Sequence, residues 1–136
     1  MIFLDTGYFI ALFTPDDHLH KRAMAWSLRL NEPFLISEYV LWECVNGFSK
    51  PKDRTTAHEL VNYVEHDSKC KLIHATPKLF AAGLQLHRDR PDKEWSLTDC
   101  ISFHLMREHG IKRALAYDIH FEQAGFEALL RNDPPA

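Results

Sequence analysis

The sequence lacks any apolar run approaching the ~20 residues that a membrane-spanning helix requires. Residues 1–5 carry no basic stretch ahead of their apolar side chains, so we expect a strand there and not a signal peptide. The three cysteines are widely separated and form no C-x-x-C pair, which argues against a disulfide framework or a zinc site and favours a reducing cytoplasm. No glycine-rich phosphate-binding loop is present, so nucleotide hydrolysis is not expected.

A broad excess of basic charge is also missing, because the net charge of the chain is −3. A duplex-binding protein usually shows such an excess. An enzyme acting on nucleic acid can nevertheless be acidic, because catalytic carboxylates count as negative charges even though metal ions mask them in use. The net charge therefore neither supports nor excludes nucleic acid as a substrate.

The length and composition are those of a single globular domain. Hydrophobic residues make up 46% of the 136 residues and charged residues 26%. A chain of this length is long enough to bury a core of its own. We find no internal repeat or low-complexity segment. We therefore place one domain at residues 1–131 and expect residues 132–136 to form a flexible C-terminal tail.

Short apolar runs alternate with segments of helical periodicity along the chain. The apolar runs predict strands at 2–4, 34–36, 72–73 and 114–116, with a short edge strand within 126–130. The periodic segments predict helices at about 17–30 and 38–48, after Asp53 and from Pro77, and from Thr98 to about 109. Asp53 and Thr98 are the expected N-caps of two of these helices. This alternation predicts a three-layer α/β/α sandwich around a central, mainly parallel sheet of four to five strands.

Four acidic residues lie where this topology would bring them together. Asp5 directly follows the first predicted strand and Asp118 the fourth, so both belong at the carboxyl rim of a parallel sheet, where ligands bind. Asp99 lies in the first turn of a helix that enters from the same rim if the crossover is right-handed. Glu43 lies in the middle of a predicted helix. Each acid alone could be a cap, a turn residue or a solvated side chain, but their joint placement favours one shared pocket.

Converging carboxylates indicate a particular chemistry. They repel one another in a partly dry site, so the arrangement is costly unless a cation neutralises it. Mg²⁺ and Mn²⁺ prefer oxygen ligands, and either ion can lower the pKa of a bound water and stabilise charge on a phosphodiester. The pattern therefore favours a Mg²⁺ or Mn²⁺ site over a zinc site.

Several segments resemble the motifs of one known family, the PIN-domain ribonucleases, and in particular the small VapC-type toxins of toxin–antitoxin pairs. The similarity runs nearly from end to end, with the motifs in the family's order over a chain of the right length. The segments that carry it are residues 2–12, 17–23, 38–47, 96–103 and 117–121.

The resemblance implies metal-dependent endonucleolytic cleavage of RNA. The acids that match the family's catalytic and metal-binding positions are Asp5, Glu43, Asp99 and Asp118. Thr6 and Thr98 match positions where hydroxyl groups support the acids. The chain departs from the family around the last acid, with Tyr117 where a hydroxyl residue is common and Ile119 where a basic or polar one is. His120 could touch a substrate phosphate, but we expect a solvated loop histidine.

Other side chains are candidates for RNA contact. Lys50, Lys52 and Arg54 cluster near the end of the Glu43 helix and could hold phosphates, although a charge run is usually only a solvated loop. Trp42 and Trp95 could stack on bases, but packing is the more common use of tryptophan.

The resemblance also implies partners: a homodimer, and an antitoxin that inserts a peptide segment into a groove. The helices around Trp26 and Val61 are candidate surfaces, because amphipathic helices in a small domain often have apolar area to spare. The alternative that remains open is a PIN-like module that binds RNA or a protein without cutting.

Overall fold

A five-stranded sheet runs through the computed structural model, which describes residues 1–136. The strands are β1 (Ile2–Leu4), β2 (Phe34–Ser37), β3 (Cys70–Ile73), β4 (Arg113–Leu115) and β5 (Glu127–Ala128). Their order is β3-β2-β1-β4-β5, and every neighbouring pair is parallel. The central strand β1 is buried along its whole length, as expected of a parallel strand covered on both faces. The predicted parallel sheet is confirmed.

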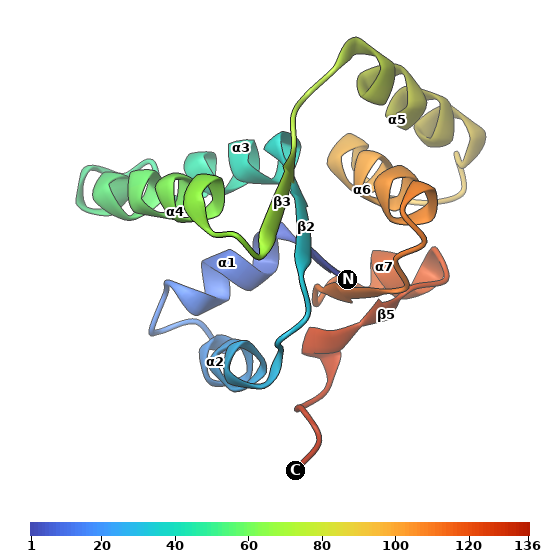
Figure 1. Cartoon of the computed structure of the whole chain (residues 1–136). Helices are drawn as coiled ribbons and strands as arrows, with labels where there is room; N and C mark the ends of the chain where they lie inside the picture. The colour runs from blue at the N-terminus through green and yellow to red at the C-terminus, as the bar shows by residue number, and fades with distance from the viewer.

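Helices cover both faces of this sheet and make the predicted three layers (Figure 1). One face carries α1 (Thr6–Leu12), α2 (His20–Arg29), α3 (Glu38–Gly47) and α4 (Arg54–His66). The other carries α5 (Pro77–Asp89), α6 (Leu97–Glu108) and α7 (Ile119–Gln123). Two short 3₁₀ helices complete the fold, η1 (Pro51–Asp53) and η2 (Leu129–Arg131). None of the helices has the length and apolar character needed to cross a membrane.

The order of the strands creates a topological switch point beside β1, where the direction in which successive strands are added reverses. The chain steps outward from β1 to β2 and β3, and then returns to the other side of β1 to form β4 and β5. Right-handed connections place α1–α4 on one face and α5–α7 on the other. Ligands of open parallel sheets bind at the carboxyl ends of the strands where the direction of stepping reverses, which here is between β1 and β4. Asp5 follows β1 directly, and Asp118 lies three residues after the end of β4.

One of the predicted helix starts is wrong. The N-cap of α6 is Ser96 and not Thr98, because Ser96 and Asp99 form a capping box in which each side chain accepts a hydrogen bond from the other's backbone N–H. This pair satisfies two free N–H groups at once, and Thr98 lies inside the helix. Asp53 is the N-cap residue of α4, as predicted, although its side chain makes no capping hydrogen bond. The start of α5 at Pro77 is as predicted.

The segment after residue 131, which the sequence predicts to be a flexible tail, is attached to α2 at its beginning. Trp26 Nε1 donates to the backbone oxygen of Asn132 at 2.9 Å. Arg22 Nε lies 2.9 Å from Asp133 Oδ1. These contacts hold the first residues of the segment against the α1–α4 layer.

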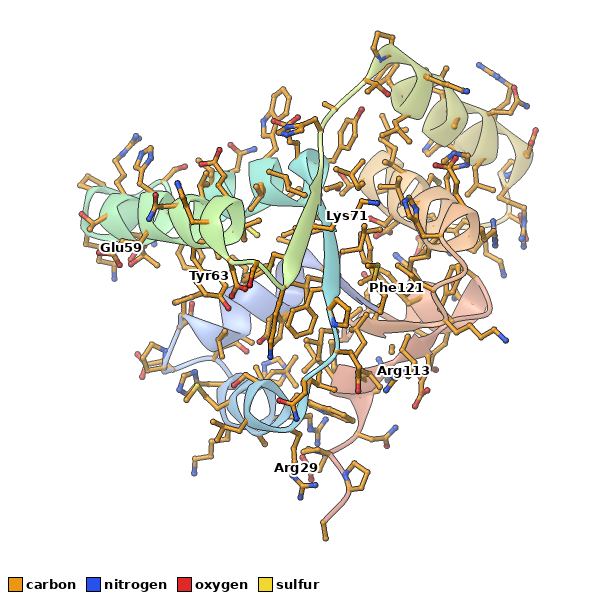
Figure 2. The ribbon with its side chains drawn as sticks, in the orientation of Figure 1. Arg29, Glu59, Tyr63, Lys71, Arg113 and Phe121 are labelled. Carbon is orange, nitrogen blue, oxygen red and sulfur yellow. The ribbon has the colours of Figure 1, made fainter.

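An aromatic cluster beneath α6 fixes the position of α7. The ring of Phe103 on α6 makes edge contacts with Trp95 and with Phe121 on α7, each at a centroid distance of 5.0 Å. Phe121 is fully buried and lies between α7 and α6 (Figure 2). The residues that precede Phe121, including Asp118 and His120, are thereby held next to the N-terminus of α6.

Candidate active site

Asp99, Asp118 and His120 form one hydrogen-bonded group at the carboxyl rim of the sheet. The capping box of α6 fixes Asp99, whose Oδ2 accepts from the Ser96 N–H at 3.1 Å. Asp118 caps α7 and accepts the His120 N–H at 3.0 Å. The imidazole of His120 lies between the two carboxylates, with Nδ1 2.9 Å from Asp99 Oδ2 and 3.2 Å from Asp118 Oδ1. The three side chains could hold a metal ion together.

The expectation that His120 is a solvated loop histidine is wrong. Its side chain is 20% exposed and contacts both acids. The reason is that residues 119–123 form a short helix capped by Asp118, which turns the His120 ring back toward Asp99. Five residues are too few to show helical periodicity in a sequence, so this placement could not be predicted.

Glu43 is held on the opposite side of the rim by Thr6. The Thr6 hydroxyl donates to Glu43 Oε1 at 2.6 Å, which links the start of α1 to the middle of α3. Thr6 directly follows Asp5, so the same contact brings Glu43 beside the end of β1. Thr98, the other threonine expected to support the acids, makes no side-chain hydrogen bond to any of them.

Asp5 lies among the other three acids, and its pKa reports their proximity. Burial, chiefly, raises the pKa of the Asp5 carboxyl to about 7, and the negative charges of Asp99, Glu43 and Asp118 raise it further, against a lowering by the Thr6 backbone N–H. A carboxylate that is both desolvated and surrounded by like charges is stable only if a cation or a proton neutralises it. The four acids therefore interact electrostatically at this rim, although only Asp99, Asp118 and His120 have ligand atoms within 4.8 Å of one another. Their role in catalysis and metal binding stays a prediction.

The donor set suits a hard divalent cation better than zinc. The four acids offer carboxylate oxygens, the ligands that Mg²⁺ and Mn²⁺ prefer. The two thiols near them, Cys44 and Cys100, are fully buried. Burial together with the charges of Asp5 and Glu43 raises the pKa of Cys44 to about 12, and burial together with the charge of Asp99 raises the pKa of Cys100. In the metal-free protein both thiols therefore stay protonated, and neither belongs to the group of side chains that could hold an ion together.

The basic residues and tryptophans lie outside the acid group. Lys50, Lys52 and Arg54 are exposed around η1, between α3 and α4, and make no ion pair with the acids. Trp95 is 4% exposed and belongs to the core, which excludes it from base stacking. Trp42, which precedes Glu43 on α3, is 67% exposed.

Comparison with known proteins agrees with the fold. Residues 2–127 match the family model of the PIN domain. The chain is 27% identical over 129 residues to VapC20 of Mycobacterium tuberculosis, a 23S rRNA-specific endonuclease, covering 93% of this chain and 95% of that protein. The crystal structure of VapC20, described as a Sarcin-Ricin loop cleaving toxin, has a TM-score of 0.86 at 25% identity, covering 94% of this chain and 98% of that one.

Two more distant structures share the fold. FitAcB from Neisseria gonorrhoeae has a TM-score of 0.68 at 19% identity, covering 93% of this chain and 95% of that one. VapBC2 from Rickettsia felis, bound to a DNA fragment from their promoter, has a TM-score of 0.65 at 16% identity, covering 93% and 96%. Because the family match spans nearly the whole chain and the fold agrees with it, this protein is a member of the PIN domain family.

Proposed function

We propose that this chain is a cytoplasmic, Mg²⁺- or Mn²⁺-dependent endoribonuclease and the toxin of a toxin–antitoxin pair. The observation that carries the proposal is the group of Asp99, Asp118 and His120 at the switch point of the sheet, together with the charges of Asp99, Glu43 and Asp118 acting on the half-buried Asp5. The similarity of nearly the whole chain to VapC20, a 23S rRNA-specific endonuclease, supports RNA as the substrate. The three cysteines are free, which is consistent with a reducing compartment.

In this proposal the protein supplies positioning and charge. Asp5, Glu43, Asp99 and Asp118 would hold the divalent ion, which when bound lowers the pKa of a water molecule and stabilises charge on the phosphodiester. Thr6 fixes the carboxylate of Glu43 through its 2.6 Å hydrogen bond. His120 fixes the carboxylates of Asp99 and Asp118 relative to each other. In this hydrolysis a water oxygen would bond to phosphorus while one P–O ester bond breaks. The leaving oxygen would take a proton, so the cut leaves one phosphate end and one hydroxyl end.

We place the RNA backbone along the α3 side of the rim. Lys50, Lys52 and Arg54 are exposed at the end of α3 and would contact phosphates. Trp42 is exposed beside Glu43 and would stack on a base.

The direct test is cleavage by the purified protein. We expect cleavage of ribosomal or single-stranded RNA in Mg²⁺ or Mn²⁺, and loss of cleavage when the metal is chelated, because the four carboxylates then repel one another and no ion activates the water. Denaturing gels of the RNA products with and without chelator measure both. If the protein binds RNA but leaves it intact with every metal tried, the non-catalytic PIN-like module is the correct alternative.

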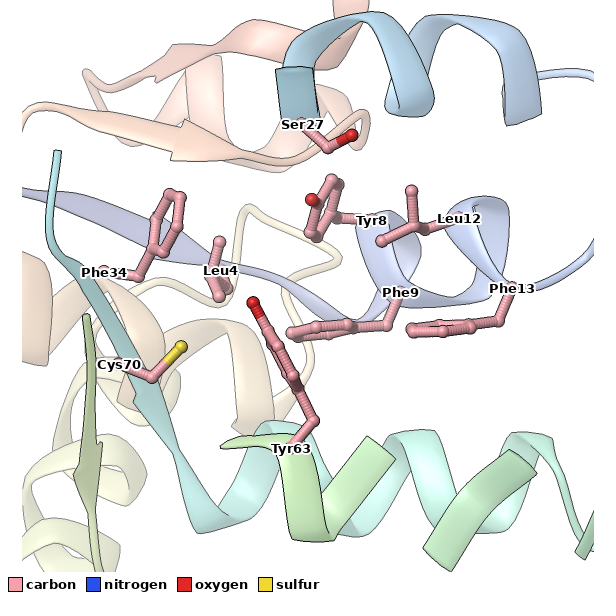
Figure 3. A pocket seen from close by; sticks show the side chains of 9 residues that line it. All are labelled: Leu4, Tyr8, Phe9, Leu12, Phe13, Ser27, Phe34, Tyr63 and Cys70. Atoms are coloured by element: carbon pink, nitrogen blue, oxygen red, sulfur yellow. The ribbon is translucent and has the colours of Figure 1, made fainter. Parts of the chain in front are cut away.

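An apolar hollow between α1, α2 and α4 is the proposed site for an antitoxin segment. Its volume is about 390 Å³, and eight of its nine lining residues are hydrophobic. Figure 3 shows the side chains converging from several elements: Leu4, Tyr8, Phe9, Leu12, Phe13, Ser27, Phe34, Tyr63 and Cys70. Phe13 and Tyr63, at 41% and 51% exposure, are available to a partner. Trp26 itself is 8% exposed and bonded to Asn132, so it is not the docking surface.

Phe13→Glu is expected to weaken binding of the antitoxin by at least about tenfold, because it places a charge in an apolar contact. Calorimetry with the antitoxin, sought as a small protein encoded next to this chain, measures the affinity. Phe80→Glu is the matched control, because Phe80 is 48% exposed but lies on α5, in the other layer. Equal affinities of wild type and Phe13→Glu would place the antitoxin elsewhere. The homodimer stays a prediction of the family resemblance.

A further inference from the structure

A second hollow, of about 360 Å³, adjoins the acid group and is not used by the proposed mechanism. Ligand pockets in proteins are usually roughly 300–1,000 Å³, so this volume is sufficient for part of a substrate. Its lining contains no hydrophobic residue: Asp92, Lys93 and Glu94 come from the loop between α5 and α6, and His120 and Gln123 come from α7. His120 is shared with the acid group, so the hollow opens directly beside Asp99 and Asp118.

The loop that forms one wall is held in a single shape. Arg90 donates two hydrogen bonds to Asp92, both of 3.0 Å. The guanidinium of Arg90 lies 4.9 Å from the ring centroid of the buried Trp95. The N–H of Lys93 donates to the oxygen of Arg90 at 3.2 Å, closing a turn with Pro91 at its second position. The carboxylate of Asp92 is paired with Arg90. Glu94 is therefore the carboxylate in this wall that forms no ion pair.

The opposite wall also presents oriented groups. Trp95 Nε1 donates to Gln123 Oε1 at 3.0 Å, so the amide NH₂ of Gln123 is free to donate to a ligand. The Nδ1 atom of His120 faces the two carboxylates, which leaves its Nε2 atom free. The hollow therefore combines an acceptor, Glu94, with two kinds of donor, the amide of Gln123 and the ammonium of Lys93, whose Nζ lies 3.8 Å from Asp92 Oδ2.

We infer that this hollow binds the nucleobase next to the cleaved phosphodiester and reads its polar edge. A nucleotide whose phosphate lies at the acid group must place its base close by, and the hollow is adjacent to that group. The edges of nucleobases carry both N–H donors and oxygen or nitrogen acceptors, which complement Glu94 and Gln123. RNA-binding proteins obtain sequence specificity mainly from single-stranded bases read in this way. The inference rests on the proposed function and adds the source of its sequence preference.

Two nearly isosteric substitutions reverse the hydrogen-bonding character of the hollow. Glu94→Gln adds donors where the wild type has only an acceptor. Gln123→Glu keeps an oxygen for Trp95 Nε1 and converts the free donor into an acceptor. Both residues are exposed, so neither change disturbs the core. Glu59→Gln, on the exposed surface of α4, is the control for the first substitution.

The experiment is cleavage of a randomised single-stranded RNA pool in Mn²⁺, with the cut ends sequenced. We expect wild type to prefer particular bases at one position beside the cut, and each variant to change that preference by roughly 10- to 100-fold, the range of a good hydrogen-bonded base contact. Preferences within one pool are relative, so a change in total turnover does not alter them. Glu59→Gln should keep the wild-type preference.

Three results would overturn the inference, and they are distinguishable. If wild type cuts and the variants cut with unchanged preferences, the hollow does not read a base although the proposed function stands. If both variants slow cleavage equally at all sequences, the hollow contacts the RNA backbone and not a base. If wild type cuts no RNA with any metal, the proposed function fails and the inference falls with it.

Discussion

Glu43→Gln and Asp99→Asn are each expected to reduce RNA cleavage by at least about 100-fold. Each substitution removes one negative charge and one carboxylate oxygen from the proposed metal site. Metal ions lower the activation free energy of such reactions by several kcal/mol, and each change of about 1.4 kcal/mol corresponds to a tenfold change in rate. The amide oxygen that Glu43→Gln introduces can still accept from the Thr6 hydroxyl, so the loss would report charge and not a missing hydrogen bond. Initial rates on one RNA substrate with Mn²⁺ measure the effect.

The matched control for Glu43→Gln is Glu59→Gln, because Glu59 is exposed on α4 (Figure 2) and is not one of the four acids. We expect the control to cleave at the wild-type rate. Circular dichroism of each variant separates a lost site from a lost fold. Full activity in both Glu43→Gln and Asp99→Asn would show that the four acids are not the active site.

The metal-free protein is expected to lose stability as the pH rises from about 4 to about 7. The pKa of Asp5 is raised from 3.8 to about 7 in the folded state, so between these values the folded chain binds more protons than the unfolded chain. Stability then falls with pH, because folding requires Asp5 to keep a proton that the unfolded chain releases. Each tenfold change in proton affinity corresponds to about 1.4 kcal/mol. A pKa difference of about three therefore lowers the free energy of unfolding by roughly 4 kcal/mol at most.

Asp5→Asn should remove most of this pH dependence and should be more stable than wild type at pH 7 without metal. Urea unfolding at several pH values in the presence of a chelator measures both effects. Added Mg²⁺ or Mn²⁺ should restore the stability of wild type at pH 7 by mass action, by about 1–3 kcal/mol, and should stabilise Asp5→Asn much less. Parallel pH profiles for wild type and Asp5→Asn would contradict the buried, charge-crowded position of Asp5.

The sheet and the order of the acids could be predicted from the sequence because both follow from local patterns. Runs such as Ile2–Leu4 and Phe34–Ile36 are apolar throughout, as buried parallel strands must be. Asp5 and Asp118 follow two of these runs closely, and parallel strands bring their carboxyl ends to one rim.

The contacts between the acids and their neighbours could not be predicted, because they depend on side-chain geometry. The sequence suggests Thr98 as the cap of α6 and places Asp99 among mutually repelling carboxylates. In the structure Asp99 accepts from the Ser96 N–H and faces His120, so Asp99→Asn also alters the capping box of α6 and the contact with His120. Asp5, whose side chain makes no capping hydrogen bond, is therefore the better residue for the stability test.

The pairing of β1 with β4 sets when the protein can become active during its synthesis. Phe3 pairs with Ala114, so the central strand gains its second neighbour only after most of the chain has been made. Such distant parallel pairing is slow, because a long loop must close before any contact forms. Until then Asp5 and Asp118 are not held together. We expect nascent and truncated chains ending before β4 to be inactive, so that a cell has the time of translation and folding in which to supply the antitoxin.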